Sequence, residues 1–308
     1  MLARVLDLDA SLLGQPTLGS AVGRGEVRCV PLRDLAGRLR IVAARKTLRE
    51  FERRVGLDDR VHSGRPSVDF VGSGDFHHLT ARLLARFTEP LTVIHVDNHP
   101  DWVSWPRNFN CGGWVNRALD LPHVQQVITL GPCSADLDLP ELKLGNLRAL
   151  AAGRLEVYPW RHEPSRVFRR YGAGASHRTD NGHLVWTTLA DKSWSVFVEA
   201  LVARVPTEAV YLTIDKDALS ATDAVTNWDQ GEMVLEHVLT LIERIAARRR
   251  LIGADVCGEY SPLRFTGWHR RLLSWLDRGT PAPIDPDACA QNERTNQRLL
   301  EAFSRCTP

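Results

Sequence analysis

The sequence has few cysteines, and no two of them form a CxxC motif. The six cysteines of this 308-residue chain lie far apart, at Cys29, Cys111, Cys133, Cys257, Cys289 and Cys306. Such spacing argues against a disulfide framework and against a zinc site built from thiolates. The cysteine pattern therefore predicts free, reduced thiols of the kind found in cytoplasmic proteins.

Long apolar segments are also lacking. No apolar run approaches the length needed to cross a membrane. The amino-terminal stretch MLARVLDLDASLLGQ carries Asp7 and Asp9 within its apolar residues, which a secretory signal peptide would not. We therefore expect a cytoplasmic protein without a membrane partner. The sequence leaves the oligomeric state open, and a homo-oligomer is one option.

A concentrated charge of one sign is missing as well. The formal net charge is only +2, and lysine occurs four times. The single basic run, residues 248–250, follows a helix-like segment, where positive charge complements the carboxyl-terminal end of the helix dipole. Nucleic-acid binding normally requires a basic face, so we expect no nucleic-acid partner.

Short apolar runs alternate with helix-like segments along the chain. The runs are rich in valine and isoleucine and are too short for helices. They lie at residues 29–32, 40–44, 68–72, 92–97, 124–131, 154–160, 183–189, 209–215 and 251–258, and the helix-like segments lie at 77–87, 113–121, 193–205 and 232–250. This alternation predicts a three-layer α/β/α fold with a mostly parallel central sheet. We expect one such domain over residues 1–308.

Acids and histidines follow the predicted strands at their carboxyl ends. The run TVIHVD leads into DNHPD (97–101), and VYLTID leads into Asp215 and Asp217. Alternate side chains of an extended segment share a face, so Asp97, His99 and Asp101 can converge on one point. Ligands of parallel α/β sheets bind outside the carboxyl ends of the strands, and the sequence therefore predicts a site there.

Four aspartates in one pocket would oppose folding unless cations balanced them. No cluster of arginine or lysine is placed to do so, whereas two divalent cations would supply the four positive charges. Oxygen ligands with one or two imidazoles and no thiolate favour Mn²⁺ over structural Zn²⁺. One DxD motif is common in solvated loops, but two motifs directly after apolar strands favour a metal site. His95 lies inside its strand and is interpreted as a core histidine.

The same residues resemble the motifs of the arginase–agmatinase (ureohydrolase) superfamily. GSGDFHH (72–78) resembles that family's GGDH motif with one extra residue, and DNHPD matches DAHxD with Asn98 in place of alanine. TIDKDAL (213–219) resembles SxDxDxxDP without the final Asp-Pro, and ADVCGEYSP (254–262) is similar to a late strand that ends in an acid and a proline. The resemblance covers roughly residues 65–265.

The resemblance implies a metal-dependent hydrolase with two Mn²⁺ ions per chain that acts on a guanidino substrate. The implied metal ligands are His77, Asp97, His99, Asp101, Asp215 and Asp217. His78 stays open as an alternative to His77. Asp101 and Glu259 are implied catalytic residues, with the Glu259 carboxylate holding the guanidinium. Trp228 and Asp229, in the loop 226–231, could line the substrate pocket.

Two departures from the family pattern leave more than one function and substrate open for this chain. The stretch NFNCGGWVN (108–116) has Cys111 where ureohydrolases have a proton-shuttling histidine, and no segment that would grip a free amino acid is recognisable. An arginine side chain in a peptide is therefore an alternative substrate to a small guanidino compound. Two further alternatives are a one-metal zinc deacetylase of the same fold and a non-catalytic relative that binds metal or a guanidino ligand.

Overall fold

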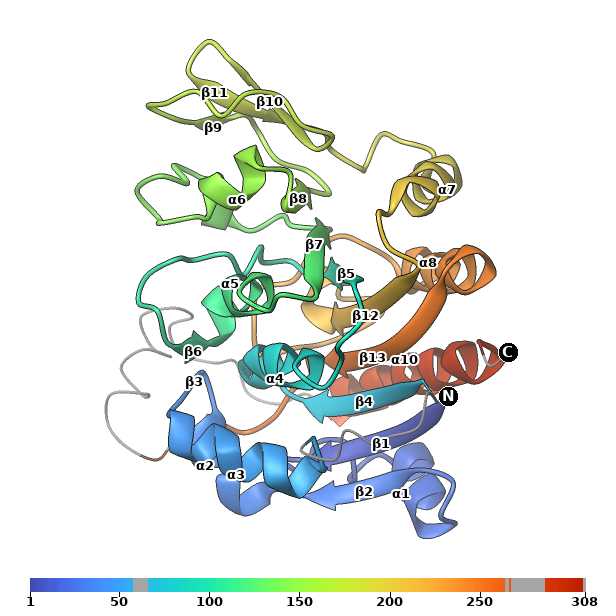
Figure 1. The fold of residues 1–308 in the computed structure, drawn as a ribbon. Helices are drawn as coiled ribbons and strands as arrows, with labels where there is room; N and C mark the ends of the chain where they lie inside the picture. Colours follow the sequence, from blue (N-terminus) through green and yellow to red (C-terminus); the bar gives the residue numbers. More distant parts are fainter. Residues whose placement is uncertain (58–65, 264–265, 267–285, 307–308) are drawn as a thin grey trace.

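A parallel eight-stranded sheet forms the middle of the molecule (Figure 1). The computed structural model describes residues 1–57, 66–263, 266 and 286–306. In spatial order the strands are β2 (Arg28–Pro31), β1 (Leu2–Asp7), β4 (Ser67–Gly72), β13 (Arg250–Cys257), β12 (Ala209–Asp215), β5 (Leu91–Val96), β7 (Val124–Leu130) and β8 (Leu155–Tyr158). Every neighbouring pair in this sheet is parallel.

The central strands are buried on both faces, which explains their sequences. Every residue of β4, β5 and β12 is buried. Strands covered on both faces read as continuous apolar runs rather than as alternating patterns. The apolar runs of the sequence therefore mark the strands at the centre of the sheet.

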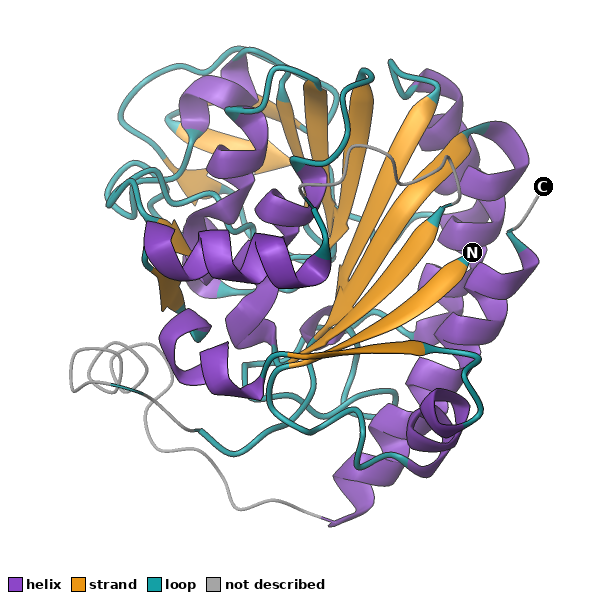
Figure 2. Ribbon diagram, turned by 60° about the horizontal axis from the view of Figure 1, so that its bottom comes forward, coloured by secondary structure: helices purple, strands orange, loops and turns teal. Residues whose placement is uncertain are grey.

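Helices cover the two faces of the sheet (Figure 2). One apolar core joins the sheet to α2 (Arg33–Leu39), α3 (Arg45–Val55), α4 (Thr80–Leu84), α5 (Trp114–Leu119) and α6 (Leu147–Ala151). The other core joins it to α1 (Pro16–Gly23), α7 (Trp194–Arg204), α8 (Leu235–Arg248) and α10 (Pro286–Arg305). The predicted three-layer α/β/α architecture with a parallel sheet is confirmed.

Two small antiparallel sheets lie outside this sheet. One contains β9 (Ser165–Arg166), β10 (His177–Asp180) and β11 (His183–Trp186), and the other pairs β3 (Val42–Ala43) with β6 (Phe109–Asn110). The runs predicted at 40–44 and 183–189 therefore belong to antiparallel pairs and not to the parallel sheet. Strand β1 is an addition to the predicted strands, because two charged residues, Arg4 within it and Asp7 at its end, obscure its apolar pattern.

The segment 77–87, predicted as one helix, forms a 3₁₀ turn followed by a short helix. A 3₁₀ turn, η1 (Gly74–Leu79), precedes the short helix α4. Both histidines of the GSGDFHH motif lie in this turn, directly after β4.

Within the described residues, no helix is long and apolar enough to cross a membrane.

Candidate metal centre

Acids and histidines from the carboxyl ends of three strands converge at one edge of the sheet. η1 after β4 supplies one histidine, β5 and the loop after it supply four residues, and the end of β12 supplies two. In chain order these residues are His77, His95, Asp97, His99, Asp101, Asp215 and Asp217. His99 is partly buried and the other six are buried. The structure thus brings together all six predicted metal ligands.

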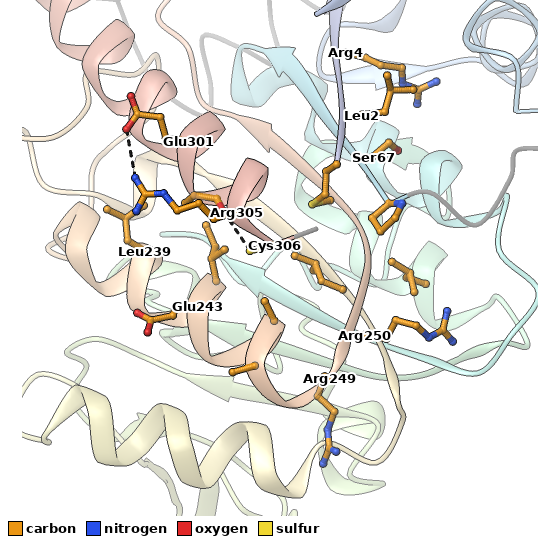
Figure 3. A pocket seen from close by; sticks show the side chains of 18 of the residues that line it. Leu2, Arg4, Ser67, Leu239, Glu243, Arg249, Arg250, Glu301, Arg305 and Cys306 are labelled. Carbon is orange, nitrogen blue, oxygen red and sulfur yellow. Dashed lines mark hydrogen bonds and ion pairs between the residues drawn. The ribbon is translucent and has the colours of Figure 1, made fainter. Parts of the chain in front are cut away.

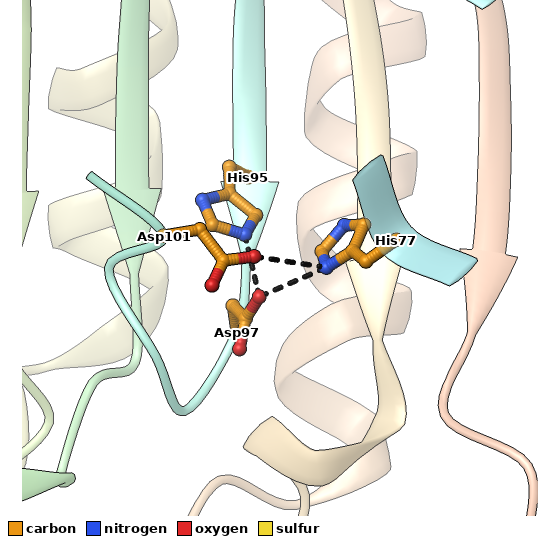
Figure 4. Close-up of side chains that lie close together, drawn as sticks. All are labelled: His77, His95, Asp97 and Asp101. Atoms are coloured by element: carbon orange, nitrogen blue, oxygen red, sulfur yellow. Dashed lines mark hydrogen bonds and ion pairs between the residues drawn. The ribbon is translucent and has the colours of Figure 1, made fainter. Parts of the chain in front are cut away.

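His77 faces three carboxylates. Its Nδ1 atom lies 3.0 Å from Asp97 Oδ2 and 3.4 Å from Asp101 Oδ2 (Figure 4). A third carboxylate oxygen, Asp215 Oδ2, lies 3.5 Å away. Although it is buried, this nitrogen makes no hydrogen bond of good geometry with any described residue. His77 therefore aims an unsatisfied nitrogen at a group of oxygens, which is the arrangement expected around a cation.

Gly74 lets η1 approach this group closely. A Cβ atom on Gly74 would lie 2.6 Å from Asp215 Oδ2, so any larger residue would displace this carboxylate. At the start of the turn, the Ser73 hydroxyl accepts a hydrogen bond from the backbone N–H of Asp75. The glycine and the serine of the GSGDFHH motif thus fix where His77 enters the cluster.

A second group forms around His99. Its Nδ1 atom lies 3.0 Å from Asp217 Oδ2 and 3.6 Å from Asp97 Oδ1. The Asp97 carboxylate therefore faces His77 with one oxygen and His99 with the other. A carboxylate shared in this way can bridge two neighbouring cations.

Asp101 is held in place by its backbone and by a tryptophan. Its φ of 46° lies in the left-handed region, which non-glycine residues adopt mostly at sites where surrounding contacts fix them. The indole Nε1–H of Trp114 donates a 2.6 Å hydrogen bond to Asp101 Oδ2. This bond turns the Asp101 carboxylate towards His77.

The cluster holds more negative charge than its histidines balance. Burial raises the pKa of Asp101 well above its usual range, and the neighbouring Asp97 carboxylate raises it further. Burial and nearby carboxylates also raise the pKa of Asp215 and Asp217. Burial lowers the pKa of His77, but the surrounding carboxylates outweigh this and raise it to about 10. In the absence of cations, protons would have to take the place of positive charge in this cluster.

These residues fit a pair of divalent cations better than they fit protons. Four clustered carboxylates match the charge of two such ions, and the donor atoms are mainly carboxylate oxygens and imidazole nitrogens, with the Cys257 thiol beside His77 and Asp215. His77, Asp97, Asp101 and Asp215 would hold one ion. Asp97, His99 and Asp217 would hold the other, with Asp215 close to both groups.

Polar side chains behind the cluster support its members. The His77 Nε2 atom lies 2.9 Å from the Thr213 hydroxyl, which donates a 2.7 Å hydrogen bond to buried Asp255. The Cys257 thiol donates to Asp215 Oδ2 over 3.1 Å. Such outer contacts fix the orientation of ligands and tune their affinity for metal.

His95 has a closer relation to the cluster than the sequence predicted. It is a buried histidine as expected, but its Nε2 atom lies 2.7 Å from Asp97 Oδ2 and its Nδ1 atom lies 3.0 Å from the Thr129 hydroxyl. The available signal was its position two residues before Asp97 in a continuous extended segment, which places both side chains on one face. His78 is buried in η1, and the clusters found among the described residues include His77 instead.

Glu259, predicted to hold the guanidinium, is engaged by other residues of the chain. Its carboxylate forms a buried ion pair with Lys216 and accepts hydrogen bonds from Asn296 (2.6 Å) and Gln15 (3.0 Å). Asn296 belongs to α10, which covers the face of the sheet opposite α4 and α5. Gly258, with a φ of 88°, interrupts the strand geometry before Glu259. An internal cation, the Lys216 ammonium, thus already pairs with Glu259.

The loop 226–231 reaches the exposed side of the cluster. Asp229 Oδ1 lies 2.9 Å from His99 Nε2, and the ring of Trp228 lies 5.6 Å from that of His99. The Trp228 indole also donates to Asp75 Oδ1 over 3.2 Å. Both residues predicted from this loop thus lie next to His99 of the candidate site.

A separate cavity opens at the other end of the strands (Figure 3). Its lining includes Leu2, Ser67 and Arg250, which begin strands β1, β4 and β13, and Glu301 and Arg305 of α10. Strand starts and strand ends lie at opposite edges of a parallel sheet. This cavity therefore belongs to a different part of the molecule from the candidate metal centre.

Sequence comparison gives limited information about this chain. No protein family model matches it. An uncharacterized protein of Thermotoga maritima is 27% identical over 198 residues, which cover 64% of this chain and 60% of that protein. The chain thus matches less than two thirds of the length of this relative.

Structure comparison is more informative about the fold. Arginase from Bacillus subtilis matches with a TM-score of 0.61 at 14% identity, covering 98% of both chains. A hypothetical agmatinase from Burkholderia thailandensis matches with a TM-score of 0.54 at 16% identity, covering 99% of this chain and 88% of that one. Formimidoylglutamase from Bacillus subtilis matches with a TM-score of 0.55 at 12% identity, covering 90% and 72%. The chain therefore has the fold of the arginases and agmatinases.

Proposed function

We propose that the protein is a hydrolase that uses two Mn²⁺ ions to cleave a guanidino group and release urea. Its substrate would be arginine, an arginine side chain in a peptide or a related guanidino compound. The observation that carries this proposal is the position of Asp97, whose two oxygens face His77 at 3.0 Å and His99 at 3.6 Å. A carboxylate shared by two ligand groups is what a pair of neighbouring cations needs.

The donor set supports Mn²⁺ as the metal. Among the ligands assigned to each ion, carboxylates outnumber imidazoles, and oxygen-rich sites suit Mn²⁺. Two bound ions of this kind would supply a water with a lowered pKa and would polarise the substrate. A deacetylase with a single zinc ion would leave the second group, around His99, without a role.

The residues of the chain would position the reactants. Trp114 holds Asp101 by its Oδ2 atom, so the other oxygen, Oδ1, can accept a hydrogen bond from the attacking water. Trp228 would offer a planar ring next to His99, against which a planar guanidinium can stack. Together these contacts would place the carbon of the substrate near the ions.

One observation favours a second candidate function. The Lys216–Glu259 ion pair occupies the carboxylate that the family resemblance assigned to the guanidinium. A protein of this kind could bind two ions without hydrolysing a guanidino compound. Turnover of a guanidino substrate distinguishes the two candidates, because both predict metal binding.

The test is a screen for urea release. Purified protein loaded with Mn²⁺ is incubated with arginine, agmatine and arginine-containing peptides, and urea is measured. The Asp97→Ala variant is the control, because it removes the shared ligand. We expect release from at least one compound by the wild type and none by the variant. Two bound ions without any turnover would instead support the non-catalytic candidate.

A further inference from the structure

We propose that Asp229 positions His99 and thereby sets the affinity of the second metal site, formed by Asp97, His99 and Asp217. This inference rests on the two-ion site of the proposed function. Asp229 would support a metal ligand without binding the metal itself, because it contacts the ring nitrogen of His99 that faces away from Asp97 and Asp217. His99 Nε2 lies 2.9 Å from Asp229 Oδ1, while its Nδ1 lies 3.0 Å from Asp217 Oδ2.

The contact fixes both the tautomer and the direction of the imidazole. A carboxylate accepts but does not donate, so Asp229 requires the proton of neutral His99 to be on Nε2. The Nδ1 lone pair then points towards Asp217 and Asp97, where a cation would be bound. Metal-ligating histidines usually have such an acceptor behind them, and its removal typically costs about 10–100-fold in metal affinity.

Asp229 is itself fixed by Asn98, the residue that stands where the family motif has alanine. The Asn98 amide donates to the Asp229 backbone carbonyl over 2.9 Å and to Asp229 Oδ2 over 3.1 Å. The backbone N–H of Asn98 donates to Asp217 Oδ1 over 3.1 Å. Asn98 therefore connects the loop 226–231 directly to the second metal site.

Further hydrogen bonds hold the loop at both ends. Asn227 Oδ1 accepts hydrogen bonds from the Ser73 hydroxyl (3.2 Å) and from the Ser261 backbone N–H (2.9 Å). The Gly231 N–H donates to the Asp217 carbonyl over 2.6 Å. The Asp229 carboxylate, although its side chain is 65% exposed, is therefore preorganised against His99.

The support of the first metal site is different. His77 Nε2 contacts a neutral and buried hydroxyl, that of Thr213. Among the described residues, the Asp229 carboxylate contacts His99 and Asn98, both of which belong to the second site or its surroundings. Loss of the Asp229 carboxylate should consequently affect one site and leave the other unchanged.

The experiment is a Mn²⁺ titration of the metal-free full-length protein by calorimetry. We expect two ions to bind the wild type, and the Asp229→Asn variant to bind one of them about 10–100-fold more weakly with the other unchanged. Asn98→Ala, which removes the anchor of Asp229, should weaken the same site. Glu232→Gln is the matched control, because Glu232 is exposed near the same loop and pairs with Arg161.

The outcomes separate this inference from the proposed function. Wild-type protein that binds two ions, with Asp229→Asn binding both at wild-type affinity, would overturn the role of Asp229 alone. Equal weakening of both sites would also overturn it, since it would indicate a general effect of the loop. Wild-type protein that binds a single ion would overturn the two-ion site and the role of Asp229 together. Thermal unfolding of the metal-free variants checks that they fold, and Asp229→Glu, which keeps the carboxylate, should recover part of the lost affinity.

Discussion

Lys216 and Glu259 form a buried ion pair, although Lys216 lies between two acids of the candidate metal centre, Asp215 and Asp217. The pair is completed by Asn296 of α10, which accepts from the Lys216 ammonium over 3.1 Å and donates to Glu259 over 2.6 Å. The Lys216 ammonium therefore neutralises the Glu259 carboxylate, to which the family resemblance assigns the binding of the substrate guanidinium.

The first prediction concerns this ion pair. Glu259→Gln should lower the free energy of unfolding by about 3–5 kcal/mol, because it leaves the Lys216 ammonium buried without its counter-charge. The double variant Lys216→Met/Glu259→Gln removes both charges and should be more stable than Glu259→Gln alone. Denaturant unfolding of the four proteins in this double-mutant cycle measures the coupling. Additive effects would show that the two residues do not interact.

A second prediction distinguishes the shared ligand from an unshared one. Asp97→Ala should abolish the binding of both ions, because Asp97 faces both His77 and His99. Asp217→Ala should abolish one, because Asp217 belongs to the group around His99. Elemental analysis after Mn²⁺ loading and dialysis gives the number of ions per chain. Equal losses in the two variants would show that Asp97 is not the bridging carboxylate.

A third prediction concerns removal of the metal. Chelation should lower the melting temperature, because burial and mutual repulsion disfavour the charged forms of Asp101, Asp215 and Asp217 when no cation is bound. Mn²⁺ at about 100 times its dissociation constant should stabilise the folded state by about 2.7 kcal/mol per site. Thermal unfolding with chelator, and again after Mn²⁺ is restored, provides the measurement. The same treatment of the Asp97→Ala variant is the control. A wild-type melting temperature that does not change when Mn²⁺ is added would exclude the metal site.

A fourth prediction concerns Cys257. Burial raises the pKa of this thiol well above its usual value, and the Asp215 carboxylate raises it further. Because the thiolate is the reactive form, Cys257 should resist iodoacetamide in the folded protein, whereas exposed Cys289 should react readily. Mass spectrometry of the alkylated peptides measures both rates in one sample. Similar rates at the two cysteines would show that Cys257 is not held against Asp215.

The sequence alone determined the layers of the fold and most of the acids and histidines of the candidate site, but not His95 or Cys257. Strands such as β5 and β12 are buried on both faces, so their apolar runs are enough to identify them. Acids directly after such strands must lie at one edge of a parallel sheet. For this reason the motifs around Asp97 and Asp215 are sufficient to predict that a cluster of acids forms there.

Tertiary structure decided which side chains face each other across the cluster. Strand alternation predicts that Glu259 points the same way as Cys257, but the left-handed conformation of Gly258 breaks this alternation and α10 supplies a partner from a distant part of the chain. The contact between Asp229 and His99 likewise joins residues 130 positions apart. A local pattern fixes which residues reach an edge of the sheet, because strand geometry is local. It cannot fix the partners of those residues, because these depend on how separate elements pack together.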